Sequence, residues 1–327
     1  MAETSRIEWT DATWNPITGC SVVSPGCTNC YAMKLAGTRL KNHPSRAGLT
    51  QLSKAGPVWT GEVRLNEAWL ADPLKWTRPR RIFVCAHGDL FHEAVPDAWI
   101  DCVLAVMALC PHHVFQVLTK RAARMRAYLS DVDLGLRIAA LLMDSARGNA
   151  AQEAYVLGAG HALTFGPGPK HIWLGVSVED QTRADERRED LAALARRGWT
   201  TFVSYEPALG PVDWRGWEFL SWLICGGENG PRPMHPDWAR SARDFCSGAG
   251  IPFFFKQWGS WISVLDRDLQ DPDWRADYPQ YEREGCRWLN LAGGHGFHGE
   301  RLQVMRKVGK AVAGRLLDGV EHNGMPA

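Results

Sequence analysis

Short apolar runs alternate with amphipathic segments along most of the chain. The apolar runs are rich in β-branched and aromatic residues and end in polar or glycine residues, which predicts buried strands. They lie at 80–91, 113–121, 171–180, 200–211, 220–231 and 251–259. The segments between them have helical spacing and often end at a glycine, which predicts helices. These lie at 31–41, 96–111, 122–132, 181–198 and 235–250, with a further helix expected over 301–326.

Repeated strand–helix alternation is typical of an α/β protein with a parallel sheet, either open or closed as a barrel. We therefore expect a partial or full TIM-like (βα) barrel in one domain spanning 1–327. The segment 131–169 reads as an irregular insertion or lid, helical at first and then rich in glycine and proline. Residues 260–327 read as a C-terminal extension.

Polar side chains follow each predicted strand. Because functional groups of a barrel gather where its strands end, these residues are expected to share one site. They are Asp89, Thr119, Lys120, Arg121, Ser177, Glu179, Ser204, Glu206, Glu228, Lys256 and Gln257.

Composition narrows the class of protein. No apolar run is long enough for a membrane span and the first residues lack a signal-peptide pattern, so a cytoplasmic protein with reduced cysteines is expected. The net charge of +1 argues against a protein that covers a long stretch of nucleic-acid duplex. However, 34–81 holds ten Lys or Arg against three Asp or Glu. This excess is either a solvated face or a surface for a polyanion. Sixteen tryptophans predict a large core with some stacking surfaces.

Three cysteines, Cys20, Cys27 and Cys30, lie within eleven residues beside Gly19, Pro25 and Gly26. A structural zinc site usually takes four ligands, a redox pair leaves Cys20 unexplained, and unrelated buried cysteines do not suit a tight loop. Three thiolates suit an iron–sulfur cluster in which one iron stays open to a cofactor or substrate. The spacing favours the cluster and leaves zinc open.

Several stretches resemble a family of three-cysteine proteins from phages and bacteria that is similar to radical S-adenosylmethionine enzymes. The stretches include IEWTDATWNPITGCSVVSPGCTNCYA, FVCAHGDLFHEAVP, LTKR, WLGVSVEDQTRADERR, SYEPALGPVD, GGENGPRPMHPDW, FFFKQWG and GRLLDGVEHNGMP. The resemblance implies a radical-enzyme barrel with a [4Fe-4S] cluster, S-adenosylmethionine and an external one-electron donor. It also implies formation of a 5′-deoxyadenosyl radical. The six-residue gap between Cys20 and Cys27 departs from the commoner three-residue gap of those enzymes.

The resemblance also implies roles for individual residues. Cys20, Cys27 and Cys30 would hold the cluster, with Tyr31 covering it, and Gly88 and Asp89 would contact the methionyl ammonium. Other groups expected near the cofactor are Lys120, Ser177, Glu179, Arg187 and Ser204. Those expected at the substrate are Glu206, Glu228 and Lys256.

The substrate expected from these features is a nucleic acid base or a nucleotide, repaired or modified in the manner of spore photoproduct lyase. Two alternatives stay open. One is a zinc-stabilised nucleic-acid binding protein without catalysis. The other is a metal-independent barrel hydrolase with Glu206 and Glu228 as an acid/base pair.

Overall fold

The computed structural model describes residues 4–146, 149–164, 166–266, 278–295 and 302–326. The chain forms two compact units. Unit 1 comprises Met1–Val176 and Arg187–Thr201, and unit 2 comprises Ser177–Glu186 and Phe202–Ala327. One domain over 1–327 stays a prediction.

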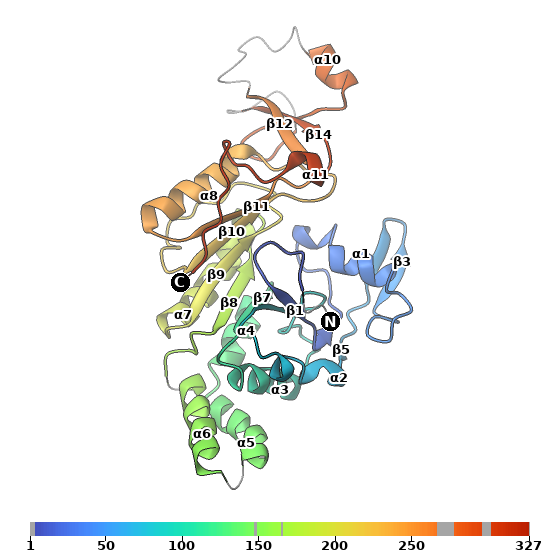
Figure 1. The fold of residues 1–327 in the computed structure, drawn as a ribbon. Helices are drawn as coiled ribbons and strands as arrows, with labels where there is room; N and C mark the ends of the chain where they lie inside the picture. The colour runs from blue at the N-terminus through green and yellow to red at the C-terminus, as the bar shows by residue number, and fades with distance from the viewer. Residues whose placement is uncertain (1–3, 147–148, 165, 267–277, 296–301, 327) are drawn as a thin grey trace. The chain divides into compact units, whose positions relative to one another are not determined.

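Seven parallel strands form the main sheet, with neighbours in the order β1-β6-β7-β8-β9-β10-β11 (Figure 1). From β6 to β11, strands that follow one another in the chain are neighbours in the sheet. This order is that of a TIM-like barrel and differs from that of a doubly wound sheet. Strands β1 and β11 are the two edges of this sheet, so it forms a partial barrel. The predicted α/β class and partial barrel are therefore confirmed. The strands are β1 (Ala12–Trp14), β6 (Arg81–Val84), β7 (Val114–Thr119), β8 (Ile172–Ser177), β9 (Thr200–Tyr205), β10 (Trp222–Gly226) and β11 (Phe253–Gln257).

Helices connect most successive strands, as the amphipathic pattern predicts. They are α3 (Asp97–Ala108), α4 (Ala122–Leu129), α7 (Gln181–Arg196) and α8 (Pro236–Ala249). Local signals set the ends of α8: the His235 side chain accepts the Asp237 amide at the start, and Gly250 is left-handed at the end. No described helix is long and apolar enough to cross a membrane.

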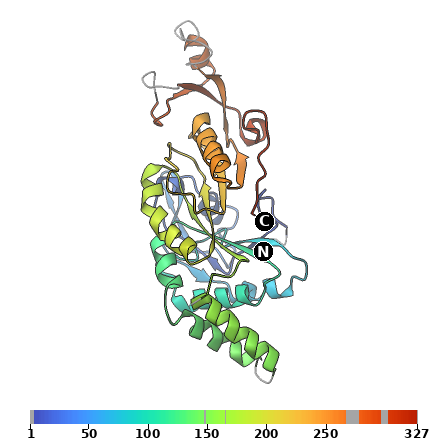
Figure 2. The ribbon, with the colours of Figure 1, turned by 90° about the vertical axis from the view of Figure 1, so that its left-hand side faces the viewer.

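The segment of unit 1 predicted as an insertion contains a pair of helices, α5 (Leu134–Ala146) and α6 (Ala150–Thr164), which lie side by side (Figures 1 and 2). The expectation that its second half is irregular is wrong for 150–164. A Cβ on Gly135 would lie 2.1 Å from the Gly160 carbonyl oxygen, so these two glycines allow the helices to approach closely. Glycine here serves helix packing and not a turn.

Apart from α1, which lies within the helix predicted over 31–41, the N-terminal part of unit 1 adds short elements that the apolar pattern did not predict. Strand β2 pairs antiparallel with β5, and β3 pairs antiparallel with β4. On α1, Ala32, Met33 and Ala36 pack against Leu49 and Trp59. The elements are β2 (Ile17–Thr18), η1 (Pro25–Cys27), α1 (Tyr31–Gly37), β3 (Thr50–Ser53), β4 (Gly56–Trp59), β5 (Arg64–Leu65), α2 (Glu67–Leu70) and η2 (Pro73–Lys75).

The C-terminal extension in unit 2 contains an antiparallel sheet in the order β12-β14-β13. Its elements are β12 (Trp261–Asp266), α10 (Tyr278–Arg283), β13 (Arg287–Leu289), β14 (Gln303–Lys307) and α11 (Lys310–Ala313). Of the helix expected over 301–326, only α11 is helical, because β14 pairs with two strands and Gly309 and Gly314 take positive φ angles. Residues 267–277, 296–301 and 327 of the expected extension lie outside the described residues.

The chain after α11 runs along the outer edge of β11. The Phe255 amide donates to the His322 carbonyl oxygen (3.0 Å), and the Gly324 amide donates to the Phe253 carbonyl oxygen (2.9 Å). This segment therefore covers backbone groups that an edge strand would expose.

Candidate functional site

The three cysteines lie on the loop between β2 and α1. Gly19 begins this loop at a φ of +97°, and a Cβ on it would lie 2.1 Å from the Glu62 carbonyl oxygen. The Cys27 amide donates to the Ser24 carbonyl oxygen (2.9 Å), and the Cys30 amide donates to the Cys27 carbonyl oxygen (3.2 Å). The tight turns of η1 thus hold Cys27 and Cys30 at the start of α1.

The thiols of these cysteines lie within electrostatic reach of one another. The Cys27 side chain is buried, and its charge acts on both Cys20 and Cys30. Burial raises the pKa of Cys20 to about 12. Burial also raises the pKa of Cys30, while the backbone amides of Met33 and Ala32 at the start of α1 act to lower it. The loop therefore presents three mostly buried sulfur atoms as one group.

This donor set fits an iron–sulfur cluster. Cys20 and Cys30 both pack against the apolar cluster formed by α1, Leu49 and Trp59. Within the described residues, no three His, Cys, Asp or Glu side chains are arranged to hold a single metal ion. The thiolates of a four-iron cluster bind different irons and need no such common point.

Arg121, directly after the exit of β7, joins the cysteine loop to the exit of β6. Its Nη1 lies 3.6 Å from Cys20 Sγ and donates to Asp89 Oδ2 at 3.0 Å. The Arg121 and Asp89 side chains are only 5% and 7% exposed, so the ion pair is buried. Burial acts to lower the pKa of Arg121. The nearby negative groups, first of all Asp89, act to raise it more strongly, so the pKa of Arg121 is raised overall.

The carboxylate of Asp89 accepts four hydrogen bonds. Oδ1 accepts from the Phe91 amide (3.0 Å) and from Thr119 Oγ1 (2.7 Å). Oδ2 accepts from the Lys120 amide (3.2 Å) and from Arg121. Each oxygen thus has two donors, and Asp89 fixes the position of Arg121. Its predicted contact with the methionyl ammonium stays a prediction.

Ser21 and His92 extend this network, and sequence reasoning assigned neither of them a role. Arg121 Nη2 donates to Ser21 Oγ at 2.7 Å, and His92 Nε2 lies 3.0 Å from the same oxygen. His92 Nδ1 accepts the Ala94 amide, so Nε2 carries the proton and donates to Ser21. Burial, followed by the charge of Arg121, lowers the pKa of His92. Glu93 accepts from Arg121 Nε at 2.9 Å. The signal available beforehand was the stretch FHE at the end of the predicted run 80–91, but no spacing rule connects it with Cys20.

The other residues predicted in unit 1 lie around the cysteine loop. A Cβ on Gly88 would lie 2.9 Å from the Ile17 carbonyl oxygen, and Gly88 pairs with Gly19, so this glycine lets the loop reach the end of β6. Lys120 is half-buried, and its charge acts to lower the pKa of Cys30. Tyr31 is 55% exposed and donates from its hydroxyl to the Ala86 carbonyl oxygen (2.7 Å). Their roles toward a cofactor stay predictions.

Unit 2 contains a second group of predicted residues. Lys256 Nζ donates to Glu206 Oε2 at 2.9 Å, and Gln257 Nε2 donates to Glu206 Oε1 at 3.0 Å. Glu228 forms an ion pair with Arg232 four residues later, and its side chain is 5% exposed. The structure thus brings Glu206 and Lys256 together and gives Glu228 a different partner.

The remaining predicted cofactor residues are buried. Ser177, the last residue of β8, and Glu179, which follows it, belong to unit 2 and are 4% and 0% exposed. Ser204 on β9 is 3% exposed. Arg187, on α7 in unit 1, is 4% exposed. Their contacts with a ribose or a carboxylate stay predictions.

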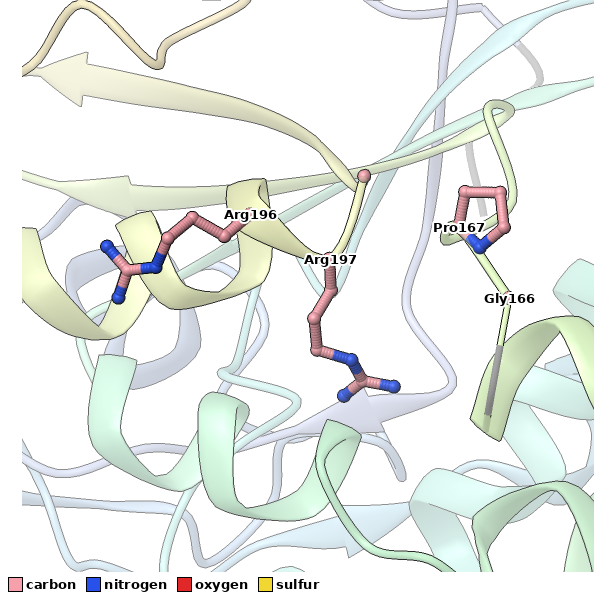
Figure 3. A pocket seen from close by; sticks show the side chains of 5 residues that line it. Gly166, Pro167, Arg196 and Arg197 are labelled. Atoms are coloured by element: carbon pink, nitrogen blue, oxygen red, sulfur yellow. The ribbon is translucent and has the colours of Figure 1, made fainter.

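A surface depression of about 300 Å³ lies elsewhere in unit 1 and is lined by residues 166–167 and 196–198 (Figure 3). Arg197 donates there to the carbonyl oxygens of Leu129 and Thr164, the latter at 2.9 Å. It thus satisfies carbonyl groups at the ends of two helices, a structural role. None of the predicted site residues lines this depression.

Comparison with solved structures finds low similarity to spore photoproduct lyase. A double mutant with bound AdoMet and dinucleoside spore photoproduct matches at 13% identity, over 94% of this chain and 71% of that one, with a TM-score of 0.40. The lyase complexed with dinucleoside spore photoproduct matches at 12% identity over the same shares, with a TM-score of 0.36. A further mutant matches at 12% identity over 68% of this chain, with a TM-score of 0.35, and there the chain spans 59% of the lyase.

No curated protein matches the chain. A family model described as "Protein of unknown function (DUF5131)" matches residues 4–326. Since that match covers nearly every residue, the chain belongs to the DUF5131 family.

Proposed function

We propose that the protein is an iron–sulfur radical S-adenosylmethionine enzyme that acts on a nucleic acid base or a nucleotide. The observation that carries this proposal is the group of three mostly buried thiols on one loop. Gly19, at the start of that loop, pairs with Gly88 just after β6 of the parallel partial-barrel sheet. When bound, the cluster and S-adenosylmethionine supply one-electron radical chemistry. The protein's part is to bind, orient and shield.

Cys20, Cys27 and Cys30 would hold the cluster. Burial and the charge of Asp89 raise the pKa of Cys20, whereas Arg121, which points an N–H at Cys20 Sγ, acts to lower it toward the thiolate needed for iron binding. Asp89 holds Arg121 in that position, and burial of both side chains keeps water from this side of the loop. His92 donates to Ser21 and fixes the residue next to Cys20.

The basic segment 34–81 supports a polyanionic substrate. Six of its ten basic residues are exposed; they are Lys34, Arg39, Lys41, Lys54, Lys75 and Arg78. The tryptophan content gives less support, because twelve of the sixteen are buried and serve the core. The nucleic acid proposal therefore rests on surface charge.

Anaerobic reconstitution with iron and sulfide tests the proposal. We expect about four irons per wild-type chain, a visible charge-transfer band, and 5′-deoxyadenosine after reduction with S-adenosylmethionine. Cys30→Ser should lose most of the iron. Cys102→Ser is the matched control, since Cys102 is a half-exposed cysteine on α3, outside the loop. A colourless wild-type protein that binds one zinc and forms no product would refute the radical enzyme and favour the zinc-stabilised binding protein.

A further inference from the structure

The side-chain amide of Gln257, at the end of β11, has an acceptor without a donor. Gln257 is 7% exposed, and within the described residues no group donates to its Oε1. Its Nε2 donates to Glu206 Oε1 at 3.0 Å. This bond fixes the amide orientation, because the flipped amide would set its oxygen against a carboxylate oxygen. A buried acceptor left unpaired is costly, and a ligand donor would remove that cost.

Lys256 provides a donor beside this acceptor. Its ammonium group has three N–H donors, and the hydrogen bonds of the described residues use one, to Glu206 Oε2. Lys256 and Gln257 bind the two oxygens of the same carboxylate, so their polar ends lie close together. The Lys256 and Glu206 side chains are 16% and 18% exposed and reach solvent, whereas Gln257 Oε1 is buried beside them. Their opposite charges balance, which favours a neutral ligand.

Gly226 keeps space beside the carboxylate. It is the last residue of β10 and lies next to Gln257 in the sheet register. A Cβ on Gly226 would lie 3.4 Å from Glu206 Oε1, so any longer side chain would crowd this group. The glycine therefore places no side chain of β10 against the Glu206 carboxylate at this position.

We propose that Gln257 Oε1 and Lys256 Nζ bind the edge of a neutral planar ring that carries an N–H next to a carbonyl oxygen, as a nucleobase of the uracil type does. The ring N–H donates to Gln257, and the ring carbonyl accepts from Lys256. A trans peptide group does not fit both partners, because its N–H and C=O point in opposite directions. The inference rests on the proposed function in taking the ring to be substrate.

Gln116 shows that an unpaired amide oxygen does not by itself indicate a ligand site. Its Oε1 also lacks a donor within the described residues, and its Nε2 donates to the Trp9 carbonyl oxygen at 3.2 Å. However, Gln116 is 0% exposed inside β7, and no charged group is bonded to it. Gln116 thus has the same unpaired amide oxygen but neither solvent exposure nor a charged partner, and it serves as the matched control.

Ligand-observed NMR titration of the cluster-free full chain tests the proposal, with uridine and N3-methyluridine as probes. The methyl group removes the ring N–H and changes little else. We expect uridine to bind at least about tenfold more tightly than N3-methyluridine, because a site built around a donor rejects the analogue that lacks it. Gln257→Met should abolish this preference, and Gln116→Met should retain it.

Equal binding of the two nucleosides to the wild-type chain, or no binding of uridine, would overturn the proposal without any variant. A preference retained in Gln257→Met would also overturn it. Iron and 5′-deoxyadenosine analysis is a separate measurement, so failure of this site and failure of the radical enzyme are distinguishable.

Discussion

The buried ion pair between Arg121 and Asp89 gives a prediction about stability. Arg121→Met keeps most of the side-chain volume but removes the guanidinium and leaves the Asp89 carboxylate uncompensated. Both side chains are less than a tenth exposed, so bulk water does not replace the lost charge. Removing one partner of such a pair costs about 3–5 kcal/mol. The further hydrogen bond to Glu93 adds little, because that side chain is 62% exposed.

Amide hydrogen exchange across β6 and β7 is a suitable assay, because it reports opening of the strands that carry this pair. Arg124→Met is the matched control: Arg124 pairs with Asp97, whose side chain is 56% exposed, and the loss of this pair should cost under about 1 kcal/mol. The double variant Arg121→Met, Asp89→Leu should recover part of the lost stability, since it no longer buries a lone charge. Equal costs for Arg121→Met and Arg124→Met would refute the reasoning, because they would show that Asp89 is effectively solvated.

Two further predictions concern pH and the cysteine loop. Burial, followed by the charge of Arg46, lowers the pKa of His87 to about 4 from 6.5. The unfolded chain therefore binds more protons between these values, and stability should fall by up to roughly 3 kcal/mol as the pH drops from about 6.5 to about 4. Acid unfolding of His87→Gln should show a shallower loss, and an unchanged pH dependence would contradict this origin. Gly19→Ala should cost well over about 2 kcal/mol in urea unfolding, since it adds the clash with Glu62 to an unfavourable φ. Gly48→Ala has a similar φ of +82° with no atom within 4 Å and should cost only about 1 kcal/mol; similar costs would show that the clash relaxes.

Much of the main sheet could be predicted because its strands are short, apolar and separated by helices with clear ends. Strand β11 and helix α8 follow the sequence pattern closely, with Gly250 ending the helix. The pattern failed where packing overrides local preference. Helix α6 contains Gly158 and Gly160, which favour a turn in isolation. Gly160 lies against Gly135 of α5, and a Cβ on it would lie 2.6 Å from the Gly135 carbonyl oxygen. Strand β14 lies in a segment with helix-like spacing, and its two neighbouring strands decide its structure.

The candidate site could be predicted only where its residues are close in sequence. The spacing of Cys20, Cys27 and Cys30 is visible directly. The contact between Arg121 and Cys20 joins residues 101 positions apart and depends on the neighbouring exits of β6 and β7. Strand exits identify such residues as candidates, but they do not say which donor meets which acceptor.

The geometry of Asp89 limits how a cofactor can use it. An ammonium group that binds this carboxylate must share or displace one of four existing donors. Displacing the guanidinium of Arg121 would break the buried pair and withdraw an N–H from Cys20, so that route disfavours the thiolate that the proposed cluster would need. Sharing Oδ1 with the Thr119 hydroxyl is less costly, because a hydroxyl can rotate and no charge is lost. We therefore expect Asp89 to act mainly by holding Arg121 against the cysteine loop, because the charge of Asp89 itself acts to raise the pKa of Cys20.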